Sequence, residues 1–321
     1  MDYKKLGTSD LLVSPVCVGC MSFGERFADF HEWTLNQEET TAVVQHALDL
    51  GINFFDTANC YAHGTSEEFL GKALKASGVS RDKAVVATKV YFNEGCLSKA
   101  AIEREIDGSL KRLGMDYVDL YIIHRYDYNT PIEETMEALS GLVDKGKVRA
   151  LGASAMYGYQ LMKMQQVAKD NGWHQFASMQ NHYNLLYRED ERELIPVCHE
   201  WGMALAPYSP LAAGHLCRTQ WDSSSERSKT DRMAREKYDS VEAVDLPIIE
   251  RVAVLAEKYG VKMSQIALAW LWAKGVTAPL IGATKASHYD DAVKALDIRL
   301  KAEDVKYLEE LYTPHKIVGA L

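Results

Sequence analysis

The chain has 321 residues, of which 47% are hydrophobic and 25% are charged, and its formal net charge is -9 at pH 7. This is the composition of an ordinary globular protein that is long enough to bury a large core. An acidic surface argues against a nucleic acid or an anionic membrane as the partner. The N-terminus has no apolar signal region, and no apolar run reaches the roughly 18–20 residues of a membrane span, so we expect a soluble, cytoplasmic protein.

The six cysteines are scattered, and only Cys17 and Cys20 lie close together in the sequence. No second pair follows at the spacing of a zinc site, so we expect no metal ion. Small buried side chains are the more usual role of such a pair. Free thiols of this kind are typical of a reducing compartment.

In chain order, a β-hairpin is predicted first, with strands at 3–6 and 11–13. Short β-branched and apolar runs then alternate with amphipathic helical patterns. The eight strands that follow are predicted at 16–19, 53–56, 84–89, 117–124, 148–154, 177–181, 204–208 and 278–282. Helices are predicted between them at 38–50, 66–77, 102–113, 132–145, 157–171 and 191–201, and several end before a glycine that suits a helix C-terminus.

The spacing of these strands predicts an α/β protein with the (β/α)8 TIM-barrel fold, in which residues 1–321 form one domain. Successive strand ends near 56, 89, 124, 154, 180 and 208 are 26 to 35 residues apart. A regular strand–helix repeat, eight times over, closes a parallel sheet with its helices outside. The competing fold is a doubly wound sheet, but the segment 19–24 lacks the G-x-G-x-x-G of its dinucleotide-binding turn. A long loop is predicted at 211–245, after the seventh strand, and loops of this length are usually functional or disordered.

Four side chains that can take part in proton transfer lie at or just after consecutive strand ends. Asp56, Lys89 and His124 end the second, third and fourth barrel strands, and Tyr61 lies in the loop after Asp56. A lysine ammonium beside a tyrosine favours the phenolate, and an aspartate keeps that lysine charged in a partly buried site. Such a set can polarise a carbonyl and protonate it, and a hydride from a reduced cofactor is the nucleophile that fits.

The motifs around these residues resemble those of the aldo-keto reductases. They are Phe55-Asp56-Thr57-Ala58-x-x-Tyr61, Thr88-Lys89, the strand that ends in His124, Leu113-Gly114-Met115-Asp116-Tyr117-Val118-Asp119-Leu120 and Pro207-Tyr208-Ser209-Pro210-Leu211. The resemblance covers essentially the whole chain. Within the family, the segments 124–133 and 178–184 resemble a bacterial YajO-type branch, a cousin of the potassium-channel β-subunits and the aflatoxin-aldehyde reductases.

The resemblance implies a role for each of the four residues and a nicotinamide cofactor. Tyr61 is the implied general acid, Lys89 and Asp56 tune it, and His124 orients the substrate carbonyl. Tyr208 is expected to stack on the nicotinamide ring. The implied cofactor-binding residues, from the nicotinamide to the adenosine end, are Ser154, Gln180, Tyr208, Ser209, Leu211, Gly214, Arg227, Gly282, Thr284 and His288.

Three positions depart from the family pattern. Ala155 stands where an asparagine commonly follows the serine of the fifth strand, so one partner of the nicotinamide carboxamide is missing. At the adenosine end, His288 stands in place of an arginine or glutamine, and Ala292 in place of an asparagine. A mostly neutral histidine is a weaker phosphate ligand than arginine. Because Arg227 resembles the family's other ligand of the 2′-phosphate, we expect NADPH as the cofactor, with NADH as the alternative.

The residues leave two other functions open. A nucleotide-binding regulatory module with low turnover would carry the same motifs. A Schiff-base lyase would also place a lysine such as Lys89 at a strand end, although pairing with Asp56 favours the charged lysine, which does not form imines. The substrate is expected to be a small carbonyl compound, sugar-derived and phosphorylated ones included, and the oligomeric state is undetermined.

Two further features of the loops concern the substrate. Arg125 directly follows His124, and for it a surface ion pair and contact with an anionic substrate are equal alternatives. Four aromatic residues after the first, third and fourth strands are candidates for the wall of a substrate pocket: Phe23, Trp33, Tyr91 and Tyr126.

Overall fold

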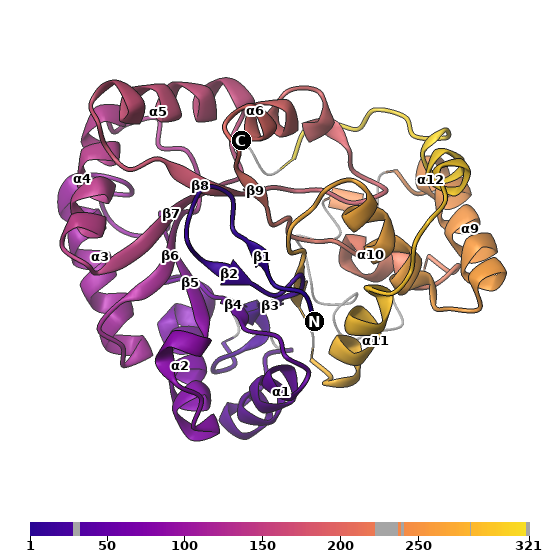
Figure 1. The fold of residues 1–321 in the computed structure, drawn as a ribbon, viewed down its shortest axis with the longest axis horizontal. Coiled ribbons are helices and arrows are strands. Elements are labelled where there is room, and N and C mark those ends of the chain that lie inside the picture. The colour runs from indigo at the N-terminus through magenta and orange to yellow at the C-terminus, as the bar shows by residue number, and fades with distance from the viewer. Residues whose placement is uncertain (28–32, 222–236, 239–240, 283, 319–321) are drawn as a thin grey trace.

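A computed structural model of the chain describes residues 1–27, 33–221, 237–238, 241–282 and 284–318. It confirms the predicted barrel (Figure 1). Eight parallel strands form one sheet in the order β10-β3-β4-β5-β6-β7-β8-β9. They are β3 (Cys17–Gly19), β4 (Phe54–Asp56), β5 (Val85–Val90), β6 (Val118–Ile123), β7 (Val148–Ser154), β8 (Phe176–Gln180), β9 (Ala204–Leu205) and β10 (Leu280–Gly282). Backbone hydrogen bonds from Thr277 N to Leu205 O (2.9 Å) and from Leu280 N to Pro207 O (2.9 Å) join the two edge strands and close the sheet.

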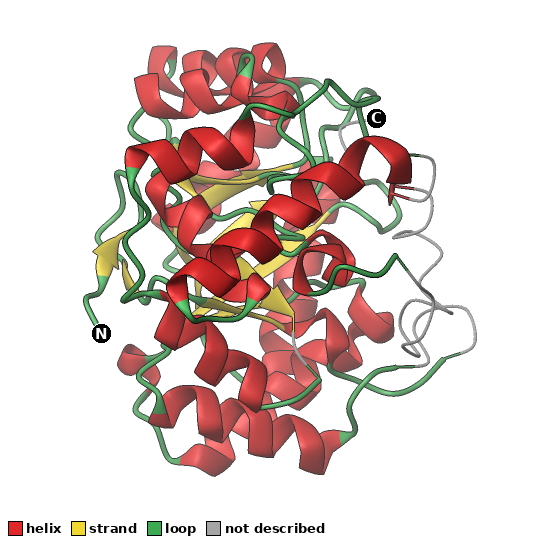
Figure 2. Ribbon diagram, turned by 90° about the vertical axis from the view of Figure 1, so that its right-hand side faces the viewer, coloured by secondary structure: helices red, strands yellow, loops and turns green. Residues whose placement is uncertain are grey.

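Helices surround the sheet, as Figure 2 shows from the side. Those in the first two thirds of the chain lie within a few residues of their predicted ranges: α1 (Gln37–Asp49), α2 (Thr65–Ser77), α3 (Lys99–Leu113), α4 (Ile132–Asp144), α5 (Gly158–Asp170) and α6 (Leu194–Glu200). The remainder contributes α9 (Glu242–Tyr259), α10 (Met263–Ala273), α11 (Ser287–Ala295) and α12 (Ala302–Glu309). Within the described ranges, none of these helices has the length and apolar character needed to cross a membrane.

The predicted hairpin is present and closes one end of the barrel (Figure 2). Its strands, β1 (Lys4–Lys5) and β2 (Leu12–Val13), are antiparallel and shorter than predicted. The hairpin buries Leu6 and Leu11 against the barrel interior. Gly7 makes the turn with a φ of 56°, and a Cβ there would lie 2.0 Å from the carbonyl oxygen of Ala177, so only glycine fits this close approach.

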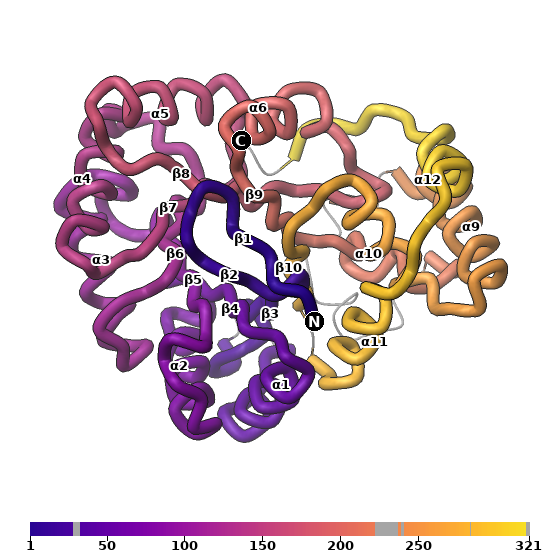
Figure 3. Tube along the Cα trace, in the orientation of Figure 1, coloured from indigo at the N-terminus to yellow at the C-terminus, as the bar shows by residue number. Residues whose placement is uncertain are grey.

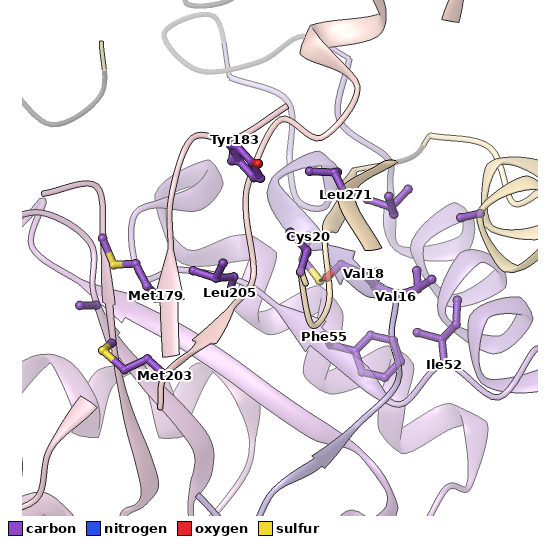
Figure 4. Close-up of a cluster of buried hydrophobic side chains, with 14 of the residues drawn as sticks. Val16, Val18, Cys20, Ile52, Phe55, Met179, Tyr183, Met203, Leu205 and Leu271 are labelled. Atoms are coloured by element: carbon purple, nitrogen blue, oxygen red, sulfur yellow. Dashed lines mark hydrogen bonds between the residues drawn. The ribbon is translucent and has the colours of Figure 1, made fainter. Parts of the chain in front are cut away.

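Side chains along each strand alternate between two hydrophobic layers. The inner layer fills the barrel and includes Phe54, Val85, Ala87, Leu120, Ile122, Ala150, Ala206 and Leu280. The outer layer packs against the helices, and Figure 4 shows part of it, including Val16, Val18, Phe55, Met179, Leu205 and Leu271. The inner layer matters for function because the next inward position along each strand lies at the C-terminal mouth of the barrel.

The last part of the chain returns across the molecule. After α12 it runs back towards α6, as the yellow end of the tube in Figure 3 shows. His315 fixes it there, because its backbone N–H donates to Glu189 Oε1 (2.8 Å) and its Nε2 lies 2.9 Å from Asp245 Oδ1. Within the predicted loop at 211–245, a 3₁₀ helix, Ala212–Cys217, lies near the start, and α9 begins at Glu242. Residues 222–236 and 239–240 of that loop lie outside the described residues.

Candidate active site

The predicted site residues continue the inward-facing series at the C-terminal mouth of the barrel. Asp56 lies two residues beyond Phe54, and Lys89 lies two beyond Ala87, so each shares the inward orientation of an interior side chain. The same alternation places four other predicted residues two positions beyond an inward-facing residue: His124 after Ile122, Ser154 after Gly152, Gln180 after Ser178 and Tyr208 after Ala206. The strand period therefore brings six of the predicted residues to one opening.

Asp56 and Lys89 form an ion pair that is removed from solvent. Lys89 is 0% exposed, and its Nζ donates to Asp56 Oδ1 and to the carbonyl oxygen of Thr57 (2.8 Å). Burial is the largest single influence on Lys89 and lowers its pKa, but the charge and hydrogen-bond effects of Asp56 and Tyr61 together exceed it, so the pKa is raised above its ordinary value. Lys89 is therefore an ammonium group at neutral pH.

Gln180 holds the same aspartate from the other side. Its Nε2 donates to Asp56 Oδ2 (2.9 Å), so each oxygen of the carboxylate receives one donor. Burial raises the pKa of Asp56, while Lys89 and the Gln180 amide oppose that rise. The sequence singled out Gln180 as a ligand of the nicotinamide; its bond to Asp56, 124 residues away, was not foreseen.

Tyr61 reaches this pair from a strained turn. Its hydroxyl lies 3.3 Å from Lys89 Nζ. The 3₁₀ turn Tyr61–Gly64 contains Ala62 (φ 45°) and His63 (φ 53°), two non-glycine residues in the left-handed region. Such backbone strain persists only where the surroundings enforce it, and it is common at functional sites. Here Ser66 anchors the turn from α2, because its hydroxyl donates to the carbonyl oxygen of Cys20 (2.7 Å).

Tyr61 is a protonated donor at neutral pH. Burial raises its pKa to about 12, and the nearby Lys89 ammonium only partly opposes that rise. The expectation that Lys89 favours the phenolate has the right sign, but in this structure desolvation is the larger effect. The phenol therefore keeps its proton at neutral pH.

His124 lies at the end of β6 and is neutral. Burial, followed by the charges of Lys89 and Arg125, lowers its pKa well below the ordinary value. Its ring meets the ring of Tyr61 edge to face, with centroids 5.8 Å apart. Its Nδ1 lies 3.8 Å from Cys60 Sγ. Burial raises the pKa of Cys60 to about 11, so the thiol is protonated and can donate to Nδ1. The ring then carries its own proton on Nε2.

Tyr208, the predicted platform for the nicotinamide, is supported from behind by other rings. It is partly exposed and stacks on His182, with centroids 5.2 Å apart and planes 8° apart. His182 stacks in turn on Tyr187 at 4.1 Å. His182 is buried, and its Nε2 is hydrogen-bonded to the hydroxyl of Tyr238 (2.7 Å). Its place in this column gives His182 a structural role behind Tyr208.

The segment after Tyr208 has the backbone expected of an anion-binding turn. Positive φ values occur at Ser209 (53°), Ala212 (49°), Ala213 (54°) and Gly214 (102°), so the peptide groups change direction sharply between Ser209 and the 3₁₀ helix. A left-handed residue directly after one with negative φ, as Ala212 (φ 49°) is after Leu211 (φ -109°), can turn successive backbone N–H groups towards an anion. Leu211 caps this 3₁₀ helix.

The residues predicted at the adenosine end are the least completely described. Gly282 ends β10, Thr284 is exposed just after it, and His288 lies in the first turn of α11. Burial and the charge of Lys285 lower the pKa of His288, so its imidazole is neutral before any phosphate binds. Arg227 lies outside the described residues. No group of three or more His, Cys, Asp or Glu side chains that could hold a metal ion occurs in the part of the chain that is described.

One of the candidate wall residues is wrong. Phe23 is fully buried in the outer hydrophobic layer and cannot line a substrate pocket. Tyr91 and Tyr126, by contrast, are partly exposed on the loops after β5 and β6. Phe92 was not among the predicted wall residues, but it is 52% exposed and its ring centroid lies 5.0 Å from that of His124. The signal that the sequence offered was a second aromatic residue directly after Tyr91, in the loop that follows the strand containing Lys89.

Comparisons with known proteins identify the family of the chain. The profile described as "Aldo/keto reductase family" matches residues 15–313. A versiconal hemiacetal acetate reductase of Aspergillus parasiticus is 40% identical over 99% of this chain and 98% of its own length. An aldo-keto reductase of Alternaria alternata is 38% identical over 97% of this chain and 91% of its own length. The crystal structure of a thermostable aldo-keto reductase, Tm1743, in complex with the inhibitor epalrestat, superimposes with a TM-score of 0.78 at 28% identity, covering 97% of this chain and 100% of that one. The chain therefore belongs to the aldo/keto reductase family and is an oxidoreductase of the kind that interconverts carbonyl compounds and alcohols.

Proposed function

We propose that the protein reduces aldehydes or ketones to alcohols with NADPH, and that Tyr61 donates the proton. One observation carries this proposal: Lys89 Nζ binds the Asp56 carboxylate and lies 3.3 Å from the Tyr61 hydroxyl, at the mouth of the barrel and beside a neutral His124. A buried ammonium next to a protonated phenol stabilises the phenolate as the proton leaves.

The residues at the mouth fit a nicotinamide dinucleotide. Tyr208 offers a supported aromatic face, and the positive-φ segment from Ser209 to Gly214 suits a pyrophosphate. Ser154 and Gln180, paired in register at the ends of β7 and β8, would hold the carboxamide. Leu211, Gly282, Thr284 and His288 would complete the contacts towards the adenosine. When bound, the reduced cofactor supplies a hydride to the carbonyl carbon.

The protein's own groups then manage the proton and the orientation of the substrate. The neutral His124 donates a hydrogen bond from Nε2 to the carbonyl oxygen, because its Nδ1 faces the Cys60 thiol. Tyr61 gives its proton to the same oxygen as negative charge develops there. Lys89 stabilises the resulting phenolate, and Asp56, held by Gln180, keeps Lys89 charged and in place.

The charge state of Lys89 disfavours the Schiff-base alternative. Imine formation requires a neutral amine, whereas Asp56 and Tyr61 together raise the pKa of Lys89 despite its burial. The low-turnover regulatory module is distinguished by experiment. NADPH remains the proposed cofactor on the strength of Arg227, while the neutral His288 leaves NADH as the alternative.

Three further expectations remain predictions. They are a single domain over residues 1–321, a cytoplasmic location, and membership of the bacterial YajO-type branch. The proposed partner is a small carbonyl substrate, with no nucleic acid and no membrane.

The test is single-turnover reduction of 4-nitrobenzaldehyde by protein loaded with NADPH, or with NADH in parallel, followed at the nicotinamide absorbance band. Tyr61→Phe should slow the reaction by about 10²- to 10⁴-fold, the usual contribution of a general acid. The affinity for NADPH should stay close to that of the wild type. If the wild type oxidises no NADPH with any member of a broad aldehyde panel, the protein is the regulatory module instead. If Tyr61→Phe reduces the aldehyde nearly as fast as the wild type, Tyr61 is not the acid.

A further inference from the structure

Arg125 is a partly buried cation beside the candidate catalytic centre, and its contacts distinguish it from other arginines of the protein. Its Nη1 donates to the carbonyl oxygen of His124 (2.7 Å), and its guanidinium carbon lies 5.5 Å from the centroid of the Phe92 ring. Within the described ranges, no carboxylate lies within ion-pair distance of it. The surface ion pair considered for Arg125 from the sequence is therefore not formed by the described residues.

Other partly buried arginines do have anionic partners. Arg81 binds Asp119 at 2.7 Å, Arg112 binds Glu67 at 2.6 Å, and Arg188 binds a glutamate at 2.7 Å. Burying a charge is costly unless it is paired. A guanidinium has five N–H donors, and one carbonyl oxygen satisfies only a small part of them. Arg125 therefore keeps a planar fork of donors that suits a carboxylate or a phosphate.

The position of Arg125 places these N–H donors near the barrel mouth, where the substrate would bind. The guanidinium of Arg125 lies over the ring of Phe92. That ring packs edge to face against the ring of His124, with centroids 5.0 Å apart. The positive charge of Arg125 also opposes the rise in pKa that burial causes at Cys60 and at Tyr208. Cys60 and Tyr208 lie on different loops of the barrel mouth. Because the charge of Arg125 acts on both residues, its guanidinium lies close to the opening between these loops.

Phe92 adds a second element of recognition. With 52% of its surface exposed, it presents apolar area next to the guanidinium. Tyr91 packs edge to face against it, with centroids 5.1 Å apart, and fixes its orientation. An aromatic frame can pack against this surface while an acidic substituent reaches Arg125.

We infer that Arg125 and Phe92 form a substrate subsite that selects aromatic carbonyl compounds bearing a carboxylate. The inference rests on the proposed carbonyl reduction and names the substrate class for that same site. It makes Arg125 a determinant of specificity: its guanidinium binds the anionic end of the substrate, and Phe92 packs against the ring between that end and the carbonyl.

The experiment compares 3- and 4-carboxybenzaldehyde with their uncharged methyl esters at saturating NADPH. In the wild type, kcat/KM should be higher for the acid of one isomer than for its ester. A charge-assisted hydrogen bond changes binding by about tenfold to hundredfold, so Arg125→Met should lower the acid-to-ester ratio of kcat/KM by this factor. Arg125→Lys keeps the charge without the fork and should lower the ratio less. The matched control is Lys163→Met, which removes another cation near the middle of α5, over the ring of Tyr159, and should leave the ratio unchanged.

Several results would overturn the inference while leaving carbonyl reduction intact. One is an acid-to-ester ratio that is the same in Arg125→Met and the wild type. Another is an equal fall in the ratio for Lys163→Met, which would indicate a general field. A third is a loss of NADPH affinity in Arg125→Met as large as the loss in kcat/KM, which would make Arg125 a ligand of the cofactor phosphates. A preference for 4-formylphenyl phosphate without any for the carboxylates would overturn the carboxylate assignment. If the wild type reduces neither acids nor esters, the proposed function itself fails.

Discussion

Replacing Asp56 by asparagine separates the two roles of the central ion pair, stability and catalysis. The carboxylate receives Lys89 on one oxygen and Gln180 on the other. Asparagine offers one acceptor oxygen and one NH2 group, so one of these donors is left facing another donor. Removing one partner of a buried pair costs about 3–5 kcal/mol. We therefore expect the free energy of unfolding to fall by about this amount at pH 7, together with a large loss of carbonyl reduction.

The pH dependence of that loss has a definite sign. In Asp56→Asn, burial acts on Lys89 without an opposing anion, so the pKa of Lys89 falls below its unfolded value of about 10.4. The folded variant then binds fewer protons than the unfolded chain, and its stability rises with pH between these two pKa values. In the wild type the pKa of Lys89 is raised instead, so its contribution is fully present below about 10.4 and gives no such rise.

The assay is urea unfolding at pH 7 and at about pH 9.5, followed by tryptophan fluorescence. The double variant Asp56→Asn/Lys89→Met removes the unpaired charge and should recover stability but not turnover. Asp119→Asn is the matched control, because Asp119 is also buried and binds Arg81 (2.7 Å) and Arg149 (2.8 Å) near the start of β6. It should lose stability and keep turnover. An Asp56→Asn variant whose stability falls as the pH rises, or lies within about 1 kcal/mol of wild type at both pH values, would refute this account of the pair.

Three other predictions concern the residues around the pair. Because burial raises the pKa of Tyr61 to about 12, kcat for reduction should stay flat from about pH 6 to pH 9, and a fall within that window would argue against Tyr61 as the acid. Cys60→Ala removes the thiol next to His124 Nδ1 (3.8 Å) and should slow reduction about threefold to tenfold, whereas Cys60→Ser should restore the rate. If the ring ¹⁵N shifts of His124 are unchanged in both variants, the thiol does not set the tautomer of His124. Ala155 has a φ of 44°, which asparagine tolerates better than alanine, so Ala155→Asn should raise Tm and lower the Kd for NADPH, and no change in either would count against this interpretation.

The sequence predicted the fold and the type of chemistry because both depend on periodic patterns. Strand ends 26 to 35 residues apart, with helical patterns between them, specify a closed parallel barrel. The two-residue period of a strand then places Asp56, Lys89 and His124 on the inner face. The predicted bounds of the barrel strands agree with the structure to within one or two residues, apart from β9, which ends three residues earlier than predicted.

Beyond the strand ends the two-residue alternation of side chains ends, and there the sequence predicts the orientation of a side chain less well. Phe23 follows β3 and was considered for the pocket wall, but the chain turns it into the outer layer, where it is fully buried. Phe92 was overlooked and lies beside His124. Backbone turns such as Ala62 and Ala155, with positive φ, are set by the surroundings rather than by the residue itself.

The sequence by itself determined which chemical groups the site contains: a carboxylate, an ammonium, a phenol and an imidazole on neighbouring strands of a barrel. Only the tertiary structure decided how they act on one another. In the structure Gln180 donates to Asp56, Cys60 lies against His124, and Arg125 has no anionic partner among the described residues. Burial also has a larger effect on the pKa of Tyr61 than the charge of Lys89 has. The reason is physical, because desolvation and hydrogen bonding depend on which side chains meet across the closed barrel, and a linear pattern does not specify those contacts.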